Sequence, residues 1–413
     1  MTMDIRESIN AALNANRLEN AETFTVAETQ QLMTEFTTLA KEHFEASNVL
    51  AALERLMVES KGAKPQLVLS QANMLLGERW ELSLPSMESY DELTTEVAME
   101  GIVDVGKKIL KFVKDTAKSL KKKGKVFFRA LGNLFRNDYQ IAQDVLAELN
   151  GKPDFKEGEL SFSDGGQFFM GEGVEYRTAA EVVTAMASNI LTLDAERFNK
   201  LFSDAAKAVA FAENDAAMNI SEVTKHCIET MNLNHTSDHD EKAYYITDGK
   251  VPGSWKYSAV TEKAVVGGQI AEFLMEGDSI LPRRRGGIKM QAMTEEEVRA
   301  VCDVIMKYSQ HGQNLVSVMA DRYWDTVAYM DKVDSSMWET HEYTDYEKDE
   351  DGNDVEITTT ITYDLARNEQ HWKAYVRISN VFWVTMHYLN ALFSHASNCN
   401  KAMAEMAQSS YEV

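Results

Sequence analysis

The most informative stretch of the sequence for fold and function is residues 101–136, GIVDVGKKILKFVKDTAKSLKKKGKVFFRALGNLFR. From its seventh residue onward it contains eleven lysines and arginines and one acidic residue, Asp115, a net charge of +10. Such a run either contacts an anionic partner or forms the solvated face of a helix. The eleven cations are Lys107, Lys108, Lys111, Lys114, Lys118, Lys121, Lys122, Lys123, Lys125, Arg129 and Arg136.

Apolar residues recur through the same stretch at the three- and four-residue spacing of an α-helix, and the pattern resumes after Gly124. We therefore predict a basic amphipathic helix. It could contact DNA phosphates without reading the base sequence, an anionic membrane surface or an acidic protein. The apolar residues are Ile102, Val105, Ile109, Phe112, Val113, Ala117, Leu120, Val126, Phe127, Phe128, Leu131, Leu134 and Phe135.

The hundred residues before this stretch have the opposite charge. Residues 1–100 contain seventeen acidic and seven basic residues, a net charge of −10. Thr25 and Glu28 have the spacing of a capping box, and the apolar pattern that follows predicts a long helix from about residue 25 to 60. The stretch from Lys61 to Pro65 should end it. We expect an acidic helical leader.

Beyond residue 150, two more capping-box sequences begin at Thr178 and Thr294. The first should open helices that run with one break to about residue 231, and the second a helix to about residue 333. Helical periodicity returns from Leu365 to about Met406. We expect the helices that begin at Thr294 and Leu365 to pack antiparallel.

Four segments between these helices depart from helical periodicity. Residues 342–363 alternate β-formers around a turn at Asp351–Asp354, which predicts a β-hairpin. Residues 151–173 predict a small hairpin or irregular loop, residues 232–240 a polar loop, and residues 241–290 short strands joined by a turn.

Together these patterns predict a mainly α fold, a bundle of long helices with minor β-hairpins. Hydrophobic residues make up 44% of the 413 residues and only five are prolines, so a sizeable helical core is possible. We expect three parts: residues 1–100, an acidic helical leader; residues 101–150, the basic helical segment; and residues 151–413, a helical body with its hairpin near 342–363.

The totals argue against several classes of protein. A net charge of −23 excludes a surface that is basic throughout, so any DNA or lipid contact must be local. Three cysteines outside any CxxC pattern predict buried thiols rather than disulfides or a zinc site. No signal peptide or long apolar span is apparent, so we expect no integral membrane segment.

Motifs for catalysis or metal binding are weak. The stretch from His235 to Asp240 could hold a divalent metal, and Arg283, Arg284 and Arg285 before two glycines could bind phosphate. Both read more simply as polar or basic loops. Cys227 beside His226 does not form a nucleophile–base pair on a helix, because adjacent residues point apart. We expect no cofactor, no metal and no catalytic residue.

The junction of the two charge segments carries a recognisable motif. Ala98, Met99 and Glu100 followed by Gly101 form a small-x-Glu sequence where the charge changes sign. In this layout the chain resembles head proteins of giant tailed bacteriophages, whose acidic helical propeptides are removed by a maturation protease after such a motif. The resemblance covers the junction and roughly the first 136 residues.

The resemblance implies an internal or structural protein of a phage head, cut after Glu100 to leave Gly101 as the new N-terminus. Head proteins, the maturation protease and packaged DNA would be its partners. It would reside in the host cytoplasm during assembly and then in the head interior, and it could form an oligomer. Two rivals stay open: a membrane-active or injected helical effector, and an enzyme with a site near His235–Asp240 or Arg283–Arg285.

Overall fold

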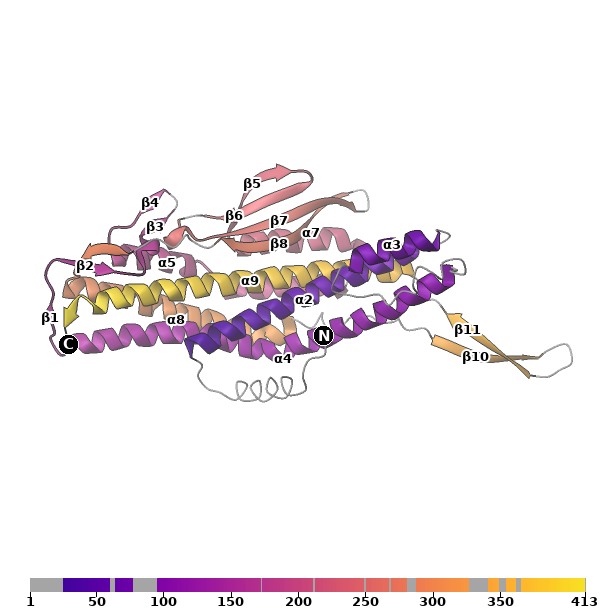
Figure 1. Ribbon diagram of the computed structural model, residues 1–413, viewed down its shortest axis with the longest axis horizontal. Helices are drawn as coiled ribbons and strands as arrows, with labels where there is room; N and C mark the ends of the chain where they lie inside the picture. Colours follow the sequence, from indigo (N-terminus) through magenta and orange to yellow (C-terminus); the bar gives the residue numbers. More distant parts are fainter. Residues whose placement is uncertain are drawn as a thin grey trace.

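The computed structural model describes residues 25–59, 64–76, 95–171, 173–210, 212–248, 250–266, 269–280, 287–326, 341–348, 354–361 and 365–412. Four long helices lie alongside one another in a bundle (Figure 1). They are α2 (Val26–Glu59), α4 (Thr95–Leu149), α8 (Glu295–Thr326) and α9 (Leu365–Gln408). The mainly α fold predicted from the sequence is confirmed.

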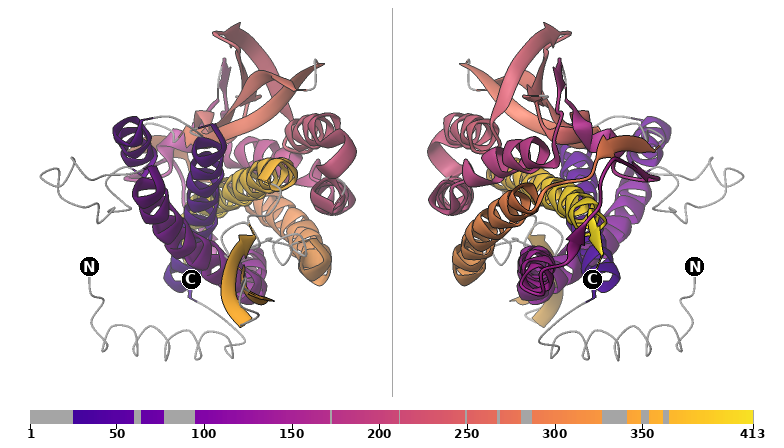
Figure 2. Two further views of the ribbon diagram at one scale, coloured as in Figure 1. Left: turned by 90° about the vertical axis from the view of Figure 1, so that its right-hand side faces the viewer. Right: turned by 90° about the vertical axis from the view of Figure 1, so that its left-hand side faces the viewer.

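Helix α9 is the centre of the bundle. Viewed end-on, it is surrounded by the other helices and by a β-sheet (Figure 2), and it contacts α2, α4, α7 and strand β8 most extensively. Tyr375, Ile378, Met386 and Leu389 are fully buried along it. The Met293 N–H at the start of α8 donates to Ser410 Oγ (3.0 Å) just beyond α9, so α8 and α9 run antiparallel as predicted.

Helix α4 is a single helix of 55 residues, about 82 Å long at roughly 1.5 Å per residue. It continues through Gly101 and Gly124, which the sequence marks as a boundary and an interruption, because its apolar face packs against α2, α8 and α9. The change of charge at Glu100 and Gly101 therefore falls inside an element. The division into three parts remains a prediction.

The capping boxes predicted from sequence begin three helices. The Thr25 and Thr294 hydroxyls accept the N–H three residues on, while the Glu28 and Glu297 carboxylates accept the Thr25 and Thr294 N–H. At the start of α5 (Ala179–Leu191) the Thr178 hydroxyl likewise accepts the Glu181 N–H, while the Glu181 carboxylate accepts the N–H of Arg177. Further helices are α3 (Pro65–Leu76), α6 (Ala195–Ala210) and α7 (Ala212–Thr230). Beyond Thr326, the predicted continuation of α8 lies outside the described residues.

A four-stranded antiparallel sheet lies on one side of the bundle, in the order β5-β6-β7-β8. Its strands are β5 (Leu233–His239), β6 (Lys242–Thr247), β7 (Lys256–Val266) and β8 (Gln269–Ile280), and β8 packs against α9 and α7. The predicted polar loop at 232–240 is wrong, because β5 is an edge strand with residues exposed on both faces. The last two strands, 11 and 12 residues long, exceed the short strands expected.

Short paired strands lie toward one end of the bundle (Figure 1). Strand β1 (Asp154–Phe155) follows α4 and pairs with β12 (Tyr411–Glu412), which follows α9. Strand β2 (Glu159–Phe162) pairs with β9 (Ile288–Gln291), and β3 (Met170–Gly171) pairs with β4 (Val174–Glu175). Two 3-10 helices, η2 (Gly166–Phe169) and η3 (Pro252–Ser254), complete this layer.

The predicted β-hairpin is confirmed as β10 (His341–Lys348) paired with β11 (Asp354–Ile361). It extends beyond one end of the bundle (Figure 1). The residues of its predicted turn between 349 and 353 lie outside the described part of the chain.

Residues on both sides of Gly101 share one hydrophobic core. Met33, Phe36 and Leu50 of α2 belong to the same buried cluster as Phe127 of α4 and Phe382 of α9. Each is no more than 1% exposed. The leader expected from its charge thus contributes a helix to the body of the fold.

Candidate functional site

The predicted cations lie on one exposed face of α4. Lys107, Lys111, Lys118, Lys122, Lys125, Arg129 and Arg136 follow one another at three-, four- or seven-residue steps along a single stripe, and Lys108 and Lys123 flank it. All nine are exposed, while Lys114 and Lys121 are half-buried. From the first cation to the last, the face extends about 44 Å at roughly 1.5 Å per residue. We call these eleven residues the basic face.

The opposite face of α4 is apolar and faces the core. Ile109, Val113, Leu120, Phe127 and Leu131 are fully buried. Their burial fixes the rotation of the helix and so directs the cations outward. The structure thus brings together all eleven residues that the sequence nominated.

Part of the positive charge is balanced within the chain. Lys123 Nζ lies 3.9 Å from Glu35 Oε2 of α2, and both side chains are nearly half exposed. Such exposed ion pairs contribute about 0–1 kcal/mol because water screens them. Among the other cations, Lys114, Lys121, Lys122, Lys125 and Arg129 also interact with neighbouring groups. The charge of +10 is therefore an upper limit on what the face offers a partner.

The junction motif lies at the start of α4. Residues from Thr95 to Glu100 are helical, Gly101 is half-buried and Ile102 is fully buried. A protease that binds its substrate in extended form would reach Glu100 only after about two helical turns unwind. Helix ends open more readily than helix middles, so this position is the favourable end of α4 for such unwinding.

The predicted polar cluster from His235 to Asp240 lies on the four-stranded sheet and not on the helix that carries the basic face. His235 Nε2 and Lys263 Nζ each lie 3.0 Å from Asp238 Oδ1 on the exposed sheet, and hydrogen bonding by His235 and then Lys263 lowers the pKa of Asp238. Among the described residues, no three His, Cys, Asp or Glu side chains gather as metal ligands would. Arg283, Arg284 and Arg285 lie outside the described residues.

The cysteines are buried thiols in the structure. Burial raises the pKa of Cys227 to about 12, and its Sγ lies 3.4 Å from Thr385 Oγ1. A thiol with so high a pKa is not a nucleophile near neutral pH. His226, its neighbour in sequence, lies with Nδ1 3.8 Å from Asp204 Oδ2 instead.

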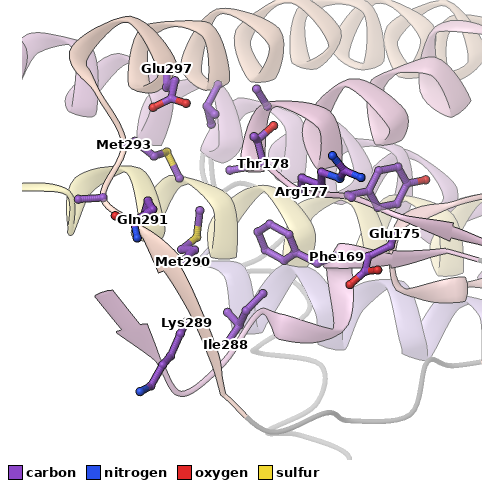
Figure 3. A pocket seen from close by; sticks show the side chains of 15 residues that line it. Phe169, Glu175, Arg177, Thr178, Ile288, Lys289, Met290, Gln291, Met293 and Glu297 are labelled. Carbon is purple, nitrogen blue, oxygen red and sulfur yellow. The ribbon is translucent and has the colours of Figure 1, made fainter. Parts of the chain in front are cut away.

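A cavity of about 470 Å³ lies where β4, the start of α5, β9 and the start of α8 meet. Figure 3 shows Phe169 and Met293 among its apolar lining and Glu175, Arg177 and Lys289 among its charged residues. The charges are of both signs, and the Thr178 and Glu297 side chains already accept backbone N–H groups at the starts of α5 and α8. The sequence did not predict this cavity, because its walls come from segments more than a hundred residues apart.

A second cavity, of about 500 Å³, lies between α2, the β7–β8 edge of the sheet and α9. Lys41 Nζ lies 5.6 Å from the centroid of the Trp383 ring beside it. His387 Nδ1 lies 3.1 Å from the Tyr257 hydroxyl, and burial lowers the pKa of this histidine. Neither cavity contains a residue of the basic face.

The structure is an elongated α-helical bundle that exposes a basic strip along one helix, without a described metal or catalytic cluster. Comparison with known families defines it further. Residues 25–321 match the family model of phiKZ-like phage internal head proteins, which is more than half of the chain. The protein belongs to this family and is a structural protein of the virion head. No curated protein and no solved structure matched.

The resemblance to internal head proteins of giant phages, seen in the sequence, is confirmed. The matched region begins at Thr25, which caps α2, so it includes both α2 and α4. Among the described helices, none is both long enough and apolar enough to cross a bilayer.

Proposed function

We propose that this internal head protein contacts packaged DNA through the basic face of α4, without reading its sequence. The observation that carries the proposal is the alignment of nine exposed cations over about 44 Å of one helix. Because the whole chain has a charge of −23, the contact would be local and orient the protein with α4 toward the DNA.

The closely spaced phosphates of duplex DNA can pair with a row of cations such as the basic face. A DNA duplex carries about one negative charge per 1.7 Å of its axis, so a strip of this length meets many phosphates. Each neutralised phosphate releases counterions, and binding weakens as salt rises. If all nine exposed cations engaged, the slope of log affinity against log salt would be at most about −8.

The burial of α4 favours DNA over the membrane-active alternative. A helix that binds a lipid surface inserts its apolar face among the acyl chains. In α4 that face is occupied by the core, with Ile109, Val113 and Phe127 fully buried. Only the charged side is accessible, and this suits an anionic polymer.

Fluorescence anisotropy with the full chain and unrelated duplexes tests the proposal. Replacing Lys107, Lys111, Lys118 and Lys122 with Gln should flatten the salt slope by about four and weaken binding equally for every duplex. A matched control replaces Lys200, Lys225, Lys307 and Lys401, exposed lysines on other helices, and should behave like the parent chain. Equal loss in both variants, or binding to anionic vesicles with none to DNA, would overturn it.

We further propose that a maturation protease cuts the chain after Glu100 during assembly, before which the protein resides in the host cytoplasm. The small-x-Glu motif at Ala98–Glu100 and its place in the first turns of α4 support this, because helix ends unwind more readily than helix middles. The chain would be a protease substrate and not an enzyme. Intact mass measured on protein from mature particles should correspond to an N-terminus at Gly101; a chain beginning at its first residues would contradict the cut.

A further inference from the structure

We infer that α4 and α9 form a helix-binding groove whose occupant is α2, and that a cut after Glu100 leaves α2 bound instead of releasing it. The inference rests on the proposed processing for its biological setting. Its physical basis is the interface of α2 with the two other helices, which is independent of any protease.

The apolar part of the interface is continuous along α2. Met33, Phe36, Leu50 and Leu53 are each no more than 1% exposed. The helix packs against both α4 and α9 over much of its length. A buried apolar stripe of this kind is how a helix binds in a groove of a partner protein.

Phe36 anchors α2 to both walls of the groove. Its ring stacks on Phe127 of α4, with centroids 4.3 Å apart, and meets the edge of Phe382 of α9 at 6.3 Å. All three rings are buried. Removal of α2 would therefore expose aromatic surface on both remaining helices, which favours its retention.

His43 connects α2 to both walls by hydrogen bonds. Its Nδ1 lies 2.9 Å from Thr116 Oγ1 of α4 and its Nε2 lies 2.9 Å from the Tyr375 hydroxyl of α9. The Thr116 hydroxyl donates to the Phe112 carbonyl, so Thr116 Oγ1 accepts from Nδ1–H and Nε2 accepts from Tyr375. Loss of α2 would leave two buried hydroxyls without this partner.

The contacts fix one register along the groove. Asn133 Nδ2 donates to Thr29 Oγ1 at 3.0 Å near the start of α2, and His43 meets Thr116 further along. Between these pairs the two helices run antiparallel, over about 21 Å of α2 and about 26 Å of α4 at roughly 1.5 Å per residue. A peptide held by aromatic and polar contacts over this length does not need its covalent connection to stay in place.

The family match gives separate support. It begins at Thr25, directly before α2, so the part of the chain that the family shares includes this helix. On this reading α2 belongs to the folded body, and a processed particle would contain two chains, one with α2 and one beginning at Gly101. Cleavage would not be required to uncover the basic face, whose nine exposed cations are exposed in the uncut chain.

The test cuts the full chain at an engineered position. A recognition sequence for a site-specific protease is inserted between Ser86 and Met87, in the interval that separates α3 from α4. After complete cutting, judged on a denaturing gel, light scattering during size exclusion should show one species of the mass of the uncut, inserted chain. Helical circular dichroism should not change.

Variants of the engineered chain locate the interaction. Phe36→Ala should raise the dissociation constant of the cut fragments by about a hundredfold or more, and Phe36→Leu by less. Asn48→Ala, at an exposed position of α2, should have no effect. Circular dichroism of each uncut variant establishes that it has folded before the cut is made.

Separation of the cut parent fragments at micromolar concentration, whether or not the larger one stays folded, would overturn the inference. So would equal dissociation of Phe36→Ala and Asn48→Ala. Neither readout uses phage protease or DNA. A particle that contains only uncut chain would therefore refute the proposed processing and leave the groove result standing, so the two failures are distinguishable.

Discussion

The two faces of α4 divide binding from folding. The face with Lys107, Lys118 and Arg129 is exposed, and the ion pair from Lys123 to Glu35 of α2 is weak. The face with Phe127 and Leu131 is fully buried against three other helices. One helix thus has a side that can be changed with little effect on stability and a side that cannot.

Substitution of the buried face should have the largest effect. Phe127→Ala removes a ring that stacks on Phe36, and a change of this kind lowers the free energy of unfolding by about 3–5 kcal/mol. Urea unfolding followed by circular dichroism measures it. The DNA affinity of the folded variant should equal that of the parent. A lower affinity of the fully folded variant would contradict the assignment of folding to one face and binding to the other.

Acid should lower the free energy of unfolding through His43, which packs from α2 against the buried face of α4. Burial lowers the pKa of His43 from 6.5 to about 4, so the folded chain disfavours its protonated form. The stability that the neutral His43 gives the folded chain is fully present above about pH 6.5, and it is lost as the pH falls from 6.5 toward 4. Its full size is about 3 kcal/mol. His395 is also buried, with its pKa lowered to about 4, and acts in the same direction.

Urea midpoints at pH 7 and pH 4.5 measure this loss, and His43→Gln should reduce the difference between them. Asp138 acts in the opposite direction, because burial raises its pKa from 3.8 to about 6. Its effect is a loss of stability as the pH rises from about 4 to 6. A pH dependence unchanged by His43→Gln would assign the acid sensitivity to other groups.

The sequence predicted which side of α4 is basic and which is apolar, but it did not predict the contacts that α4 makes with other helices. Spacing alone aligned the eleven cations, and the capping box at Thr25 predicted the start of α2 to within one residue. The apolar contacts that carry α4 through Gly101 and Gly124 were not visible, because they come from other helices. Nor were the partners of His43, which are 73 and 332 residues away.

The missed strand β5 has a related explanation. An edge strand exposed on both sides needs no alternation of polar and apolar residues, so its sequence resembles a loop. Its pairing with β6 is fixed by backbone hydrogen bonds that no side-chain pattern reports. The hairpin of β10 and β11 was predicted because its β-formers do alternate.

On the exposed face, a single substitution should change binding more than folding. Lys118→Gln should reduce the salt slope of DNA binding by about 1 and lower affinity severalfold. The free energy of unfolding should stay within about 0.5 kcal/mol of the parent. Anisotropy titrations at several salt concentrations, with urea unfolding alongside, separate the two quantities. A larger change in stability than in binding would contradict the assignment of this lysine to the basic face.

The smallest effect is expected where α2 and the basic face meet. Glu35 holds Lys123 at 3.9 Å, so the carboxylate competes with a phosphate for this lysine. Glu35→Gln should change stability by less than about 1 kcal/mol and raise DNA affinity slightly at low salt. The gain should vanish in a Glu35→Gln, Lys123→Gln double variant. A large gain would mean that the acidic side of α2 masks the basic face more than the contact between Glu35 and Lys123 implies, and cleavage would then have a role in exposing it.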